Sequence, residues 1–182
     1  MKNVFIHLAN GFEEIEAITP VDVLRRAGCE VTMVSVTGKR EVTSARGVAV
    51  QSDMLFEDMD YTRADVILFP GGQPGSDNLA RHEGLKKVII EFNRQGKIIA
   101  AICAAPIVLA NAGILQGKRV TCFPGMESRL KGAICTGNPV EIDGNIITGK
   151  AAGAAMKFSL ALTEQLFGKS KAEELKKIMY VE

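Results

Sequence analysis

The chain has 182 residues, is 47% hydrophobic, and carries 22 basic residues against 21 acidic ones. A chain of this length can bury one substantial core, so we expect a single domain over residues 1–182. A net charge of +1 gives no electrostatic reason to expect nucleic acid or a membrane surface as a partner. The longest apolar run, residues 98–110, is too short to span a bilayer.

The cysteines and the first residues indicate a compartment. Residues 1–8 lack the length and the small-residue cleavage site of a secretory signal. The four cysteines, at positions 29, 103, 122 and 135, show neither CxxC spacing nor histidine-linked metal spacing. We therefore expect a cytoplasmic protein with free thiols and without a metal site.

Strand-like and helix-like segments alternate along the chain. Short runs rich in Val and Ile predict strands at residues 4–9, 30–36, 65–69 and 97–102. The predicted helices are residues 20–27, 83–95, 104–112, 154–167 and 171–179. This alternation is typical of an α/β fold with a mostly parallel sheet between helical layers.

Turn residues mark the ends of several elements. The first predicted helix has Thr19 as its cap, Pro20 at its first position and Gly28 at its exit. Residues 140–147 predict a hairpin, in which Asp143 and Gly144 supply the positive φ angles of a tight turn.

Cys103 stands where an apolar strand leads into a helix. The segment KIIAAICAAP at residues 97–106 delivers this one cysteine to the junction, and Pro106 lies in the first helical turn, where its missing N–H costs little. Backbone amides and the positive end of a helix dipole favour a thiolate at such a corner. We therefore expect a nucleophile elbow, with a pKa for Cys103 below that of an ordinary thiol.

Three segments are expected to converge at the carboxyl ends of the strands, where ligands of open α/β sheets bind. They are residues 11–16, residues 70–75 and Cys103. Gly71 and Gly72 leave backbone amides uncovered, so these amides could meet an oxyanion or a thiolate beside the amide of Ala104. A carboxyl group from residues 13–16 could hydrogen-bond the sulfur.

These motifs resemble the ThiJ/PfpI superfamily, in the branch of the Parkinson-disease protein deglycase and bacterial YajL. The resemblance is carried by GFEEIE at residues 11–16, FPGG at 69–72 and AAICAAP at 100–106, and matches at 20–28 and 140–144 extend it over nearly the whole chain.

The resemblance implies a flavodoxin-like three-layer sandwich, usually assembled as a homodimer. It implies that Cys103 is the reactive cysteine, that Glu16 is its protonated carboxylic partner, and that Gly72 and Ala104 supply backbone N–H groups. Gly71 and Phe123 are expected to line the pocket, and no cofactor is expected.

Members of this branch are linked to removal of methylglyoxal and its protein adducts, to protection against oxidative stress and to chaperone activity. Our leading hypothesis is a glyoxalase or protein deglycase acting on a small carbonyl compound or a glycated protein. In it, Cys103 adds to an aldehyde carbon and Glu16 moves the proton. The competing hypothesis is a redox sensor or chaperone that uses an oxidisable Cys103.

A third hypothesis, a cysteine peptidase or amidohydrolase, is less favoured. Protease-like members of the superfamily place histidine after the nucleophile, whereas Ala104 stands here, and Phe123 occupies a position where some members carry histidine. The chain has only His7, inside the first predicted strand, and His82, at a helix start. Neither fits a Cys–His pair, so proton transfer would fall to Glu16 or water.

Some of these residues also have a purely structural interpretation. For Glu13 and Glu14 we favour an ordinary acidic helix entrance. The pair Gly71–Gly72 could form only a turn. Cys122 could act as a resolving thiol for oxidised Cys103, but a buried core cysteine is the favoured interpretation.

Overall fold

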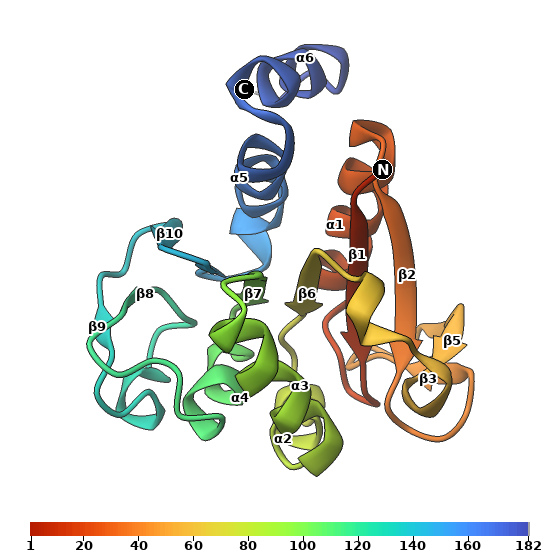
Figure 1. Ribbon diagram of the computed structural model, residues 1–182, viewed down its shortest axis with the longest axis vertical. Coiled ribbons are helices and arrows are strands. Elements are labelled where there is room, and N and C mark those ends of the chain that lie inside the picture. Colours follow the sequence, from red (N-terminus) through yellow and green to blue (C-terminus); the bar gives the residue numbers. More distant parts are fainter. Residues whose placement is uncertain (182) are drawn as a thin grey trace.

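The computed structural model describes residues 1–181 and contains a seven-stranded sheet with helices on both faces (Figure 1). Across the sheet the strands are β10 (Val140–Asp143), β11 (Ile146–Gly149), β7 (Ile98–Ile102), β6 (Val66–Phe69), β1 (Asn3–Leu8), β2 (Glu30–Ser35) and β5 (Met54–Leu55). All neighbouring strands run parallel except β10 and β11. The α/β class and the mostly parallel sheet are confirmed.

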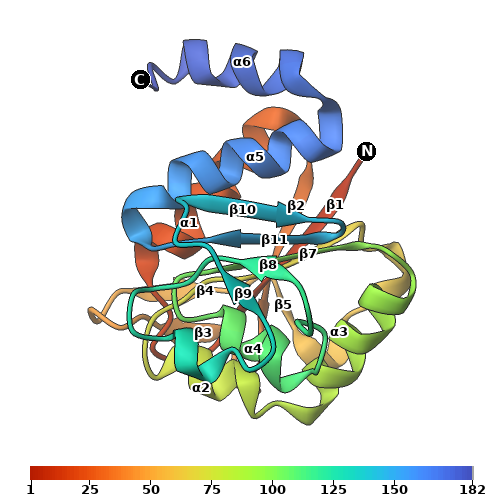
Figure 2. The same cartoon turned by 90° about the vertical axis from the view of Figure 1, so that its left-hand side faces the viewer.

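The helices form two layers. They are α1 (Glu14–Ala27), α2 (Gly75–Ala80), α3 (Glu83–Arg94), α4 (Pro106–Asn111), α5 (Ala155–Phe167) and α6 (Lys169–Ile178). Figure 2 shows α5 and α6 on one side of β10 and β11, and α2 and α4 on the other. Helix α1 packs beside α5, so these helices share a layer.

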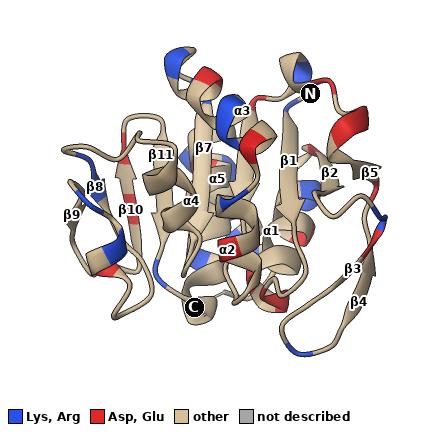
Figure 3. Ribbon diagram, turned by 90° about the horizontal axis from the view of Figure 1, so that it is seen from below, with Lys and Arg blue, Asp and Glu red and all other residues tan. Residues whose placement is uncertain are grey.

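The sheet is apolar on both faces. Along β1, Val4, Ile6 and Leu8 belong to the buried cluster under α1 and α5, while Phe5 belongs to the cluster under α2, α3 and α4. Strands β1, β6, β7 and β11 contain no Lys, Arg, Asp or Glu (Figure 3). Burial on two sides explains why these strands read as continuous apolar runs.

The first helix begins earlier than the sequence indicated. Glu13, not Thr19, caps α1, because the Glu13 side chain accepts a 2.8 Å hydrogen bond from the amide of Glu16. Pro20 therefore lies inside the helix, where it removes one backbone hydrogen bond without ending it. The predicted end is confirmed, since Gly28 adopts a left-handed conformation with φ of 98°.

Other predicted boundaries need smaller corrections. The hairpin at β10 and β11 is present, but Asp143 pairs with Ile146, so the tight turn consists of Gly144 and Asn145, and only Gly144 has a positive φ. The helix expected over 104–112 begins only at Pro106, because Ala104 and Ala105 form a turn first.

Several short elements had no periodic signal in the sequence. They are α2, β5, the hairpin of β3 (Glu41–Thr43) and β4 (Ala49–Gln51), and the parallel pair of β8 (Arg119–Val120) and β9 (Ile134–Cys135). Single-turn 3-10 helices occur at η1 (Phe56–Asp58), η2 (Tyr61–Arg63), η3 (Glu127–Arg129) and η4 (Ala152–Ala154).

Candidate active site

Cys103 forms a sharp elbow directly after β7. Its φ is 65°, in the left-handed region that non-glycine residues rarely occupy. Two backbone hydrogen bonds hold it there: its amide donates to the Gly149 carbonyl at 2.9 Å, and its carbonyl accepts from the Phe123 amide at 2.8 Å. Strain of this kind costs on the order of 1–3 kcal/mol and persists where neighbouring structure enforces it. The predicted elbow is confirmed.

Gly71 brings Cys103 and Glu16 together. The amide of Gly71 donates to Oε2 of Glu16 at 2.9 Å. A Cβ added at Gly71 would lie 2.5 Å from that oxygen and 2.6 Å from Cβ of Cys103. Only a residue without a side chain therefore allows the carboxyl group and the cysteine to approach on either side of this backbone.

Backbone amides surround the sulfur on its other side. The N–H groups of Ala104 and Gly72 hydrogen-bond the Cys103 side chain and act to lower the pKa of its thiol. Gly72 has a φ of 90°, and a Cβ there would lie 2.5 Å from the backbone of residues 11 and 13. The expected convergence of residues 11–16, residues 70–75 and Cys103 is therefore present.

Glu16 is fully buried at the base of the site. Burial raises the pKa of the Glu16 carboxyl to about 7, and the hydrogen bond with Cys103 opposes this rise. Oε1 of Glu16 is buried and accepts no hydrogen bond from an N–H or O–H group among residues 1–181. Burying a carboxyl group that has an unpaired oxygen costs less free energy when the group is protonated, which agrees with the raised pKa of Glu16.

The expected low pKa of Cys103 is wrong. Burial, together with the negative charge of Glu16, raises the pKa of this thiol to about 12. The amides of Ala104 and Gly72 act in the opposite direction but do not outweigh these two effects. The site thus contains a desolvated thiol beside a desolvated carboxyl.

Such a pair loses its two protons one at a time. The first leaves near neutral pH, and the second is held strongly because two negative charges would then share one buried site. Above about pH 7, Glu16 and Cys103 therefore share a single proton. This arrangement suits proton transfer to and from a reacting group, because the carboxyl titrates near the working pH.

The pair opens into a pocket of about 510 Å³. The residues that line it are Glu13, Glu16, Arg46, Gly72, Gln73, Cys103, Ala104, Phe123, Met126, Ala151, Ala152 and Gly153. Phe123, 48% exposed, lies in this lining as expected, whereas Gly71 lies beneath it against Glu16.

Arg46 also lines the pocket, although the sequence gave no firm reason to place it there. The hairpin of β3 and β4 carries it, and Glu14 fixes that hairpin by accepting hydrogen bonds from the Ser44 hydroxyl and from the Arg46 amide at 2.9 Å. Glu13 caps α1 and Glu14 lies in its first turn, as expected for an acidic helix entrance, but the role of Glu14 in anchoring the hairpin was not expected. Hairpins with three-residue strands give little sequence signal, so the sequence alone could not assign Arg46 to the pocket.

Neither histidine belongs to the pocket. His7 is fully buried, its Nε2 lies 2.8 Å from the Tyr61 hydroxyl, and burial lowers its pKa to about 3. His82 caps α3, where its Nδ1 accepts from the Leu85 amide at 3.0 Å. Within residues 1–181, no group of three or more His, Cys, Asp or Glu side chains could hold a metal ion. No helix in the same range is long and apolar enough to cross a membrane.

An α/β sheet with a strained cysteine elbow and a buried carboxyl partner defines a distinct class of protein. The profile of the DJ-1/PfpI family matches residues 2–165, and the chain belongs to this family.

Relatives agree with this assignment along the whole chain. Protein dj-1beta of Drosophila melanogaster is 36% identical over 182 residues, which cover 99% of this chain and 97% of that protein. The structure titled Toxoplasma gondii DJ-1, oxidized, superposes with a TM-score of 0.95 at 33% identity and covers 99% of this chain and 98% of its own. DJ-1 homolog B of Arabidopsis thaliana is 39% identical over 96% of this chain, but the match spans only 40% of that longer protein.

Proposed function

We propose that this protein is a cysteine-dependent glyoxalase or protein deglycase that acts on methylglyoxal or its thiol adducts. The observation that carries the proposal is the Cys103 thiol beside the buried Glu16 carboxyl, with Gly71 between them, at the base of an open pocket. A thiol with an adjacent base can add to an aldehyde carbon, and the same base can then move a proton between two neighbouring carbons.

The reaction begins when the sulfur of Cys103 bonds to the aldehyde carbon while Glu16 accepts the thiol proton. The resulting oxyanion accepts hydrogen bonds from the amides of Gly72 and Ala104, the same amides that contact the sulfur. Glu16 then passes the thiol proton to this oxygen, which completes a hemithioacetal and leaves the carboxylate free to act as a base. Glu16 next removes the proton from the former aldehyde carbon, which gives an enediol. Return of this proton to the neighbouring carbon gives a lactoyl thioester. Water then releases lactate and restores the thiol, so methylglyoxal and water are converted to lactate overall.

The test is lactate formation from methylglyoxal by the purified protein. We expect turnover by the wild-type protein, none above background by Cys103→Ser, and a sharp decrease in Glu16→Gln, because the first variant removes the nucleophile and the second the proton carrier. Wild-type rates in both variants would refute the mechanism. Circular dichroism of each variant controls for folding.

A second candidate, a redox sensor or chaperone, is supported by the same half-buried thiol beside two amide donors. These donors and Glu16 could hold a sulfinate at position 103. Mass spectrometry after mild peroxide treatment tests this candidate, and a Cys103 that resists oxidation would exclude it. A peptidase gains no support, because neither histidine lines the pocket.

We also propose a homodimer, assembled through the face of α1 that carries exposed aliphatic side chains. Ile15 and Ile18 are 53% and 42% exposed on α1, and Val48 is 51% exposed on the hairpin that Glu14 anchors. Exposed aliphatic side chains grouped beside a site commonly mark an interface. We expect a dimer in sedimentation equilibrium and dissociation in Ile15→Asp. A wild-type protein that stays monomeric at high concentration would rule the proposal out.

The four cysteines of this chain are all free thiols. A reducing compartment maintains this state, so we place the activity in the cytoplasm.

A further inference from the structure

Two of the remaining cysteines, Cys122 and Cys135, lie on neighbouring segments at one end of the small β8–β9 sheet. Val120 of β8 pairs with Cys135 of β9, and the Thr136 amide donates to the Val120 carbonyl at 2.9 Å. Cys122 follows Val120 by two residues. Both cysteines pack on the buried cluster under α2, α3 and α4, where Cys122 is buried and Cys135 half-buried.

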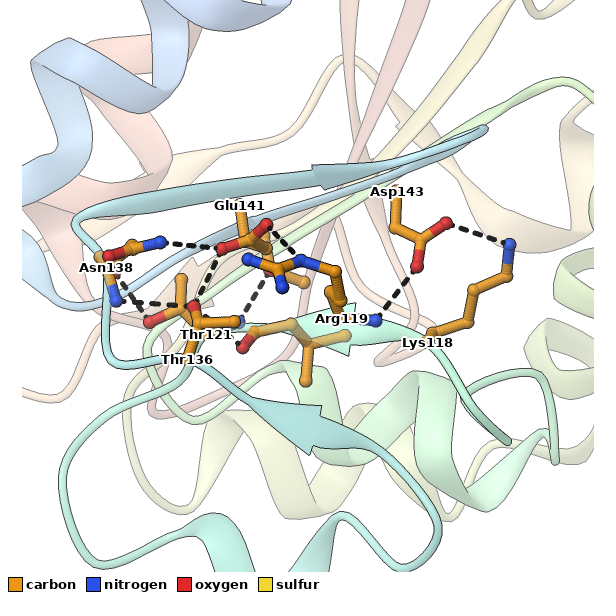
Figure 4. A network of polar contacts seen from close by, with 9 residues as sticks. Lys118, Arg119, Thr121, Thr136, Asn138, Glu141 and Asp143 are labelled. Carbon is orange, nitrogen blue, oxygen red and sulfur yellow. Dashed lines mark hydrogen bonds and ion pairs between the residues drawn. The ribbon is translucent and has the colours of Figure 1, made fainter.

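A polar network holds the backbone beside each of the two cysteines (Figure 4). Next to Cys122, the Thr121 amide donates to Oγ1 of Thr148 at 2.9 Å and the Thr121 hydroxyl donates to the Asn138 carbonyl at 2.7 Å. Next to Cys135, the Thr136 hydroxyl donates to Oε2 of Glu141 at 2.7 Å.

Glu141 anchors this network to the large sheet. It lies on β10, is buried, and also accepts hydrogen bonds from Asn138 and Arg119. Hydrogen bonds to Glu141 therefore hold both thiol-bearing segments against β10, and the pairing of β8 with β9 holds them next to each other.

The two thiols also affect each other electrostatically. Burial raises the pKa of both, and a hydrogen bond between them raises the pKa of Cys122 further while it opposes the rise at Cys135. Cys135, the more exposed of the two, is thus the better placed to react first.

Cys103 is not the natural partner of either thiol. Its side chain packs with the cluster under α1 and α5, on the opposite face of the sheet from Cys122. The backbone of residues 103 and 123 is hydrogen-bonded, yet the sulfurs of Cys103 and Cys122 belong to different faces. This argues against Cys122 as a resolving thiol for Cys103.

We propose that Cys122 and Cys135 form a reversible disulfide under peroxide, which makes them a second redox centre separate from the pocket. The Cys135 sulfur attacks a peroxide oxygen, the O–O bond breaks, and a sulfenic acid and one water form. The Cys122 sulfur then attacks the Cys135 sulfur, the S–O bond breaks, and a second water leaves. Two thiols and one hydrogen peroxide become one disulfide and two waters.

The test uses the full chain carrying Cys103→Ala, so that the pocket thiol consumes no oxidant. The reduced protein is treated with hydrogen peroxide, its free thiols are blocked with N-ethylmaleimide under denaturing conditions, and its peptides are mapped by mass spectrometry without reduction. We expect two fewer maleimide adducts, a peptide pair linked through Cys122 and Cys135, and reversal by dithiothreitol. This readout does not depend on the activity under "Proposed function".

Matched variants in the same background sharpen the result. Cys29→Ser removes the remaining cysteine, on the opposite face of the sheet, and should leave the linked pair intact. Cys122→Ser and Cys135→Ser should each abolish it, and Cys135→Ser is the safer variant because its side chain is only half-buried. Two thiols that stay open to maleimide after peroxide, separate sulfinic acids, or a link between two chains would each overturn the proposal.

Discussion

Replacing Gly71 by alanine should reduce kcat/KM for the proposed reaction with methylglyoxal on the order of a hundredfold or more, because displacing reacting groups by about 1 Å can cost this much. The new methyl group would lie 2.5 Å from Oε2 of Glu16 and 2.6 Å from Cβ of Cys103, so one of the two must move. It would also disturb the hydrogen bond that the Gly71 amide donates to Glu16.

Gly153→Ala is the matched control. Gly153 lines the same pocket, but no atom lies within 4 Å of the position that its Cβ would take. The same chemical change should therefore alter kcat/KM by a few-fold at most. Steady-state kinetics of both variants, with thermal denaturation to confirm folding, make the comparison. Equal activity of the two variants would show that close packing at Gly71 does not set the geometry of the site.

Glu16→Gln should make the protein more stable at pH 8, although it impairs the proposed reaction. Burial raises the pKa of this carboxyl from 4.5 to about 7, so between these values the folded state binds more protons than the unfolded state. The wild-type protein therefore loses stability as pH rises through this range. The two pKa values differ by about 2.5, and each unit corresponds to about 1.4 kcal/mol, so the loss approaches about 3 kcal/mol above pH 7.

The neutral glutamine does not incur this loss. Urea denaturation should show the variant to be more stable than the wild type at pH 8, with the difference shrinking as pH falls and disappearing below pH 4.5, where Glu16 becomes protonated in both states. Glu164→Gln, at an exposed carboxyl on α5, should show no such pH-dependent gain. A Glu16→Gln protein that is no more stable than the wild type at pH 8 would show that burying the charged Glu16 carboxylate does not destabilise the fold. Active sites commonly sacrifice stability in this way.

The central strands were predictable because burial on both faces leaves an unmistakable apolar run, as in β1 and β7. The cysteine elbow was predictable because Cys103 ends such a run and Pro106 begins a helix. The start of α1 was not, because a glutamate cap at Glu13 is a weaker sequence signal than a threonine followed by proline.

The pKa of Cys103 could not be predicted from the sequence, for a different reason. The sequence indicated the amides that lower the pKa of the thiol but gave no measure of how much water the fold removes around it. Desolvation and charge repulsion depend on distances that only the folded chain defines. The same holds for Arg46 and Met126, which reach the pocket from a hairpin and a loop far from Cys103 in the sequence.

The most direct test of whether Glu16 and Cys103 titrate as one unit is the rate at which iodoacetamide alkylates Cys103 at each pH. Peptide mass spectrometry measures this rate in the wild-type protein and in Glu16→Gln. The wild-type rate should climb through a transition near pH 7, where the pair loses its first proton, and Glu16→Gln should lack that transition and react only at or above the ordinary thiol pKa of about 8.5. Superimposable curves for the two proteins would contradict this account.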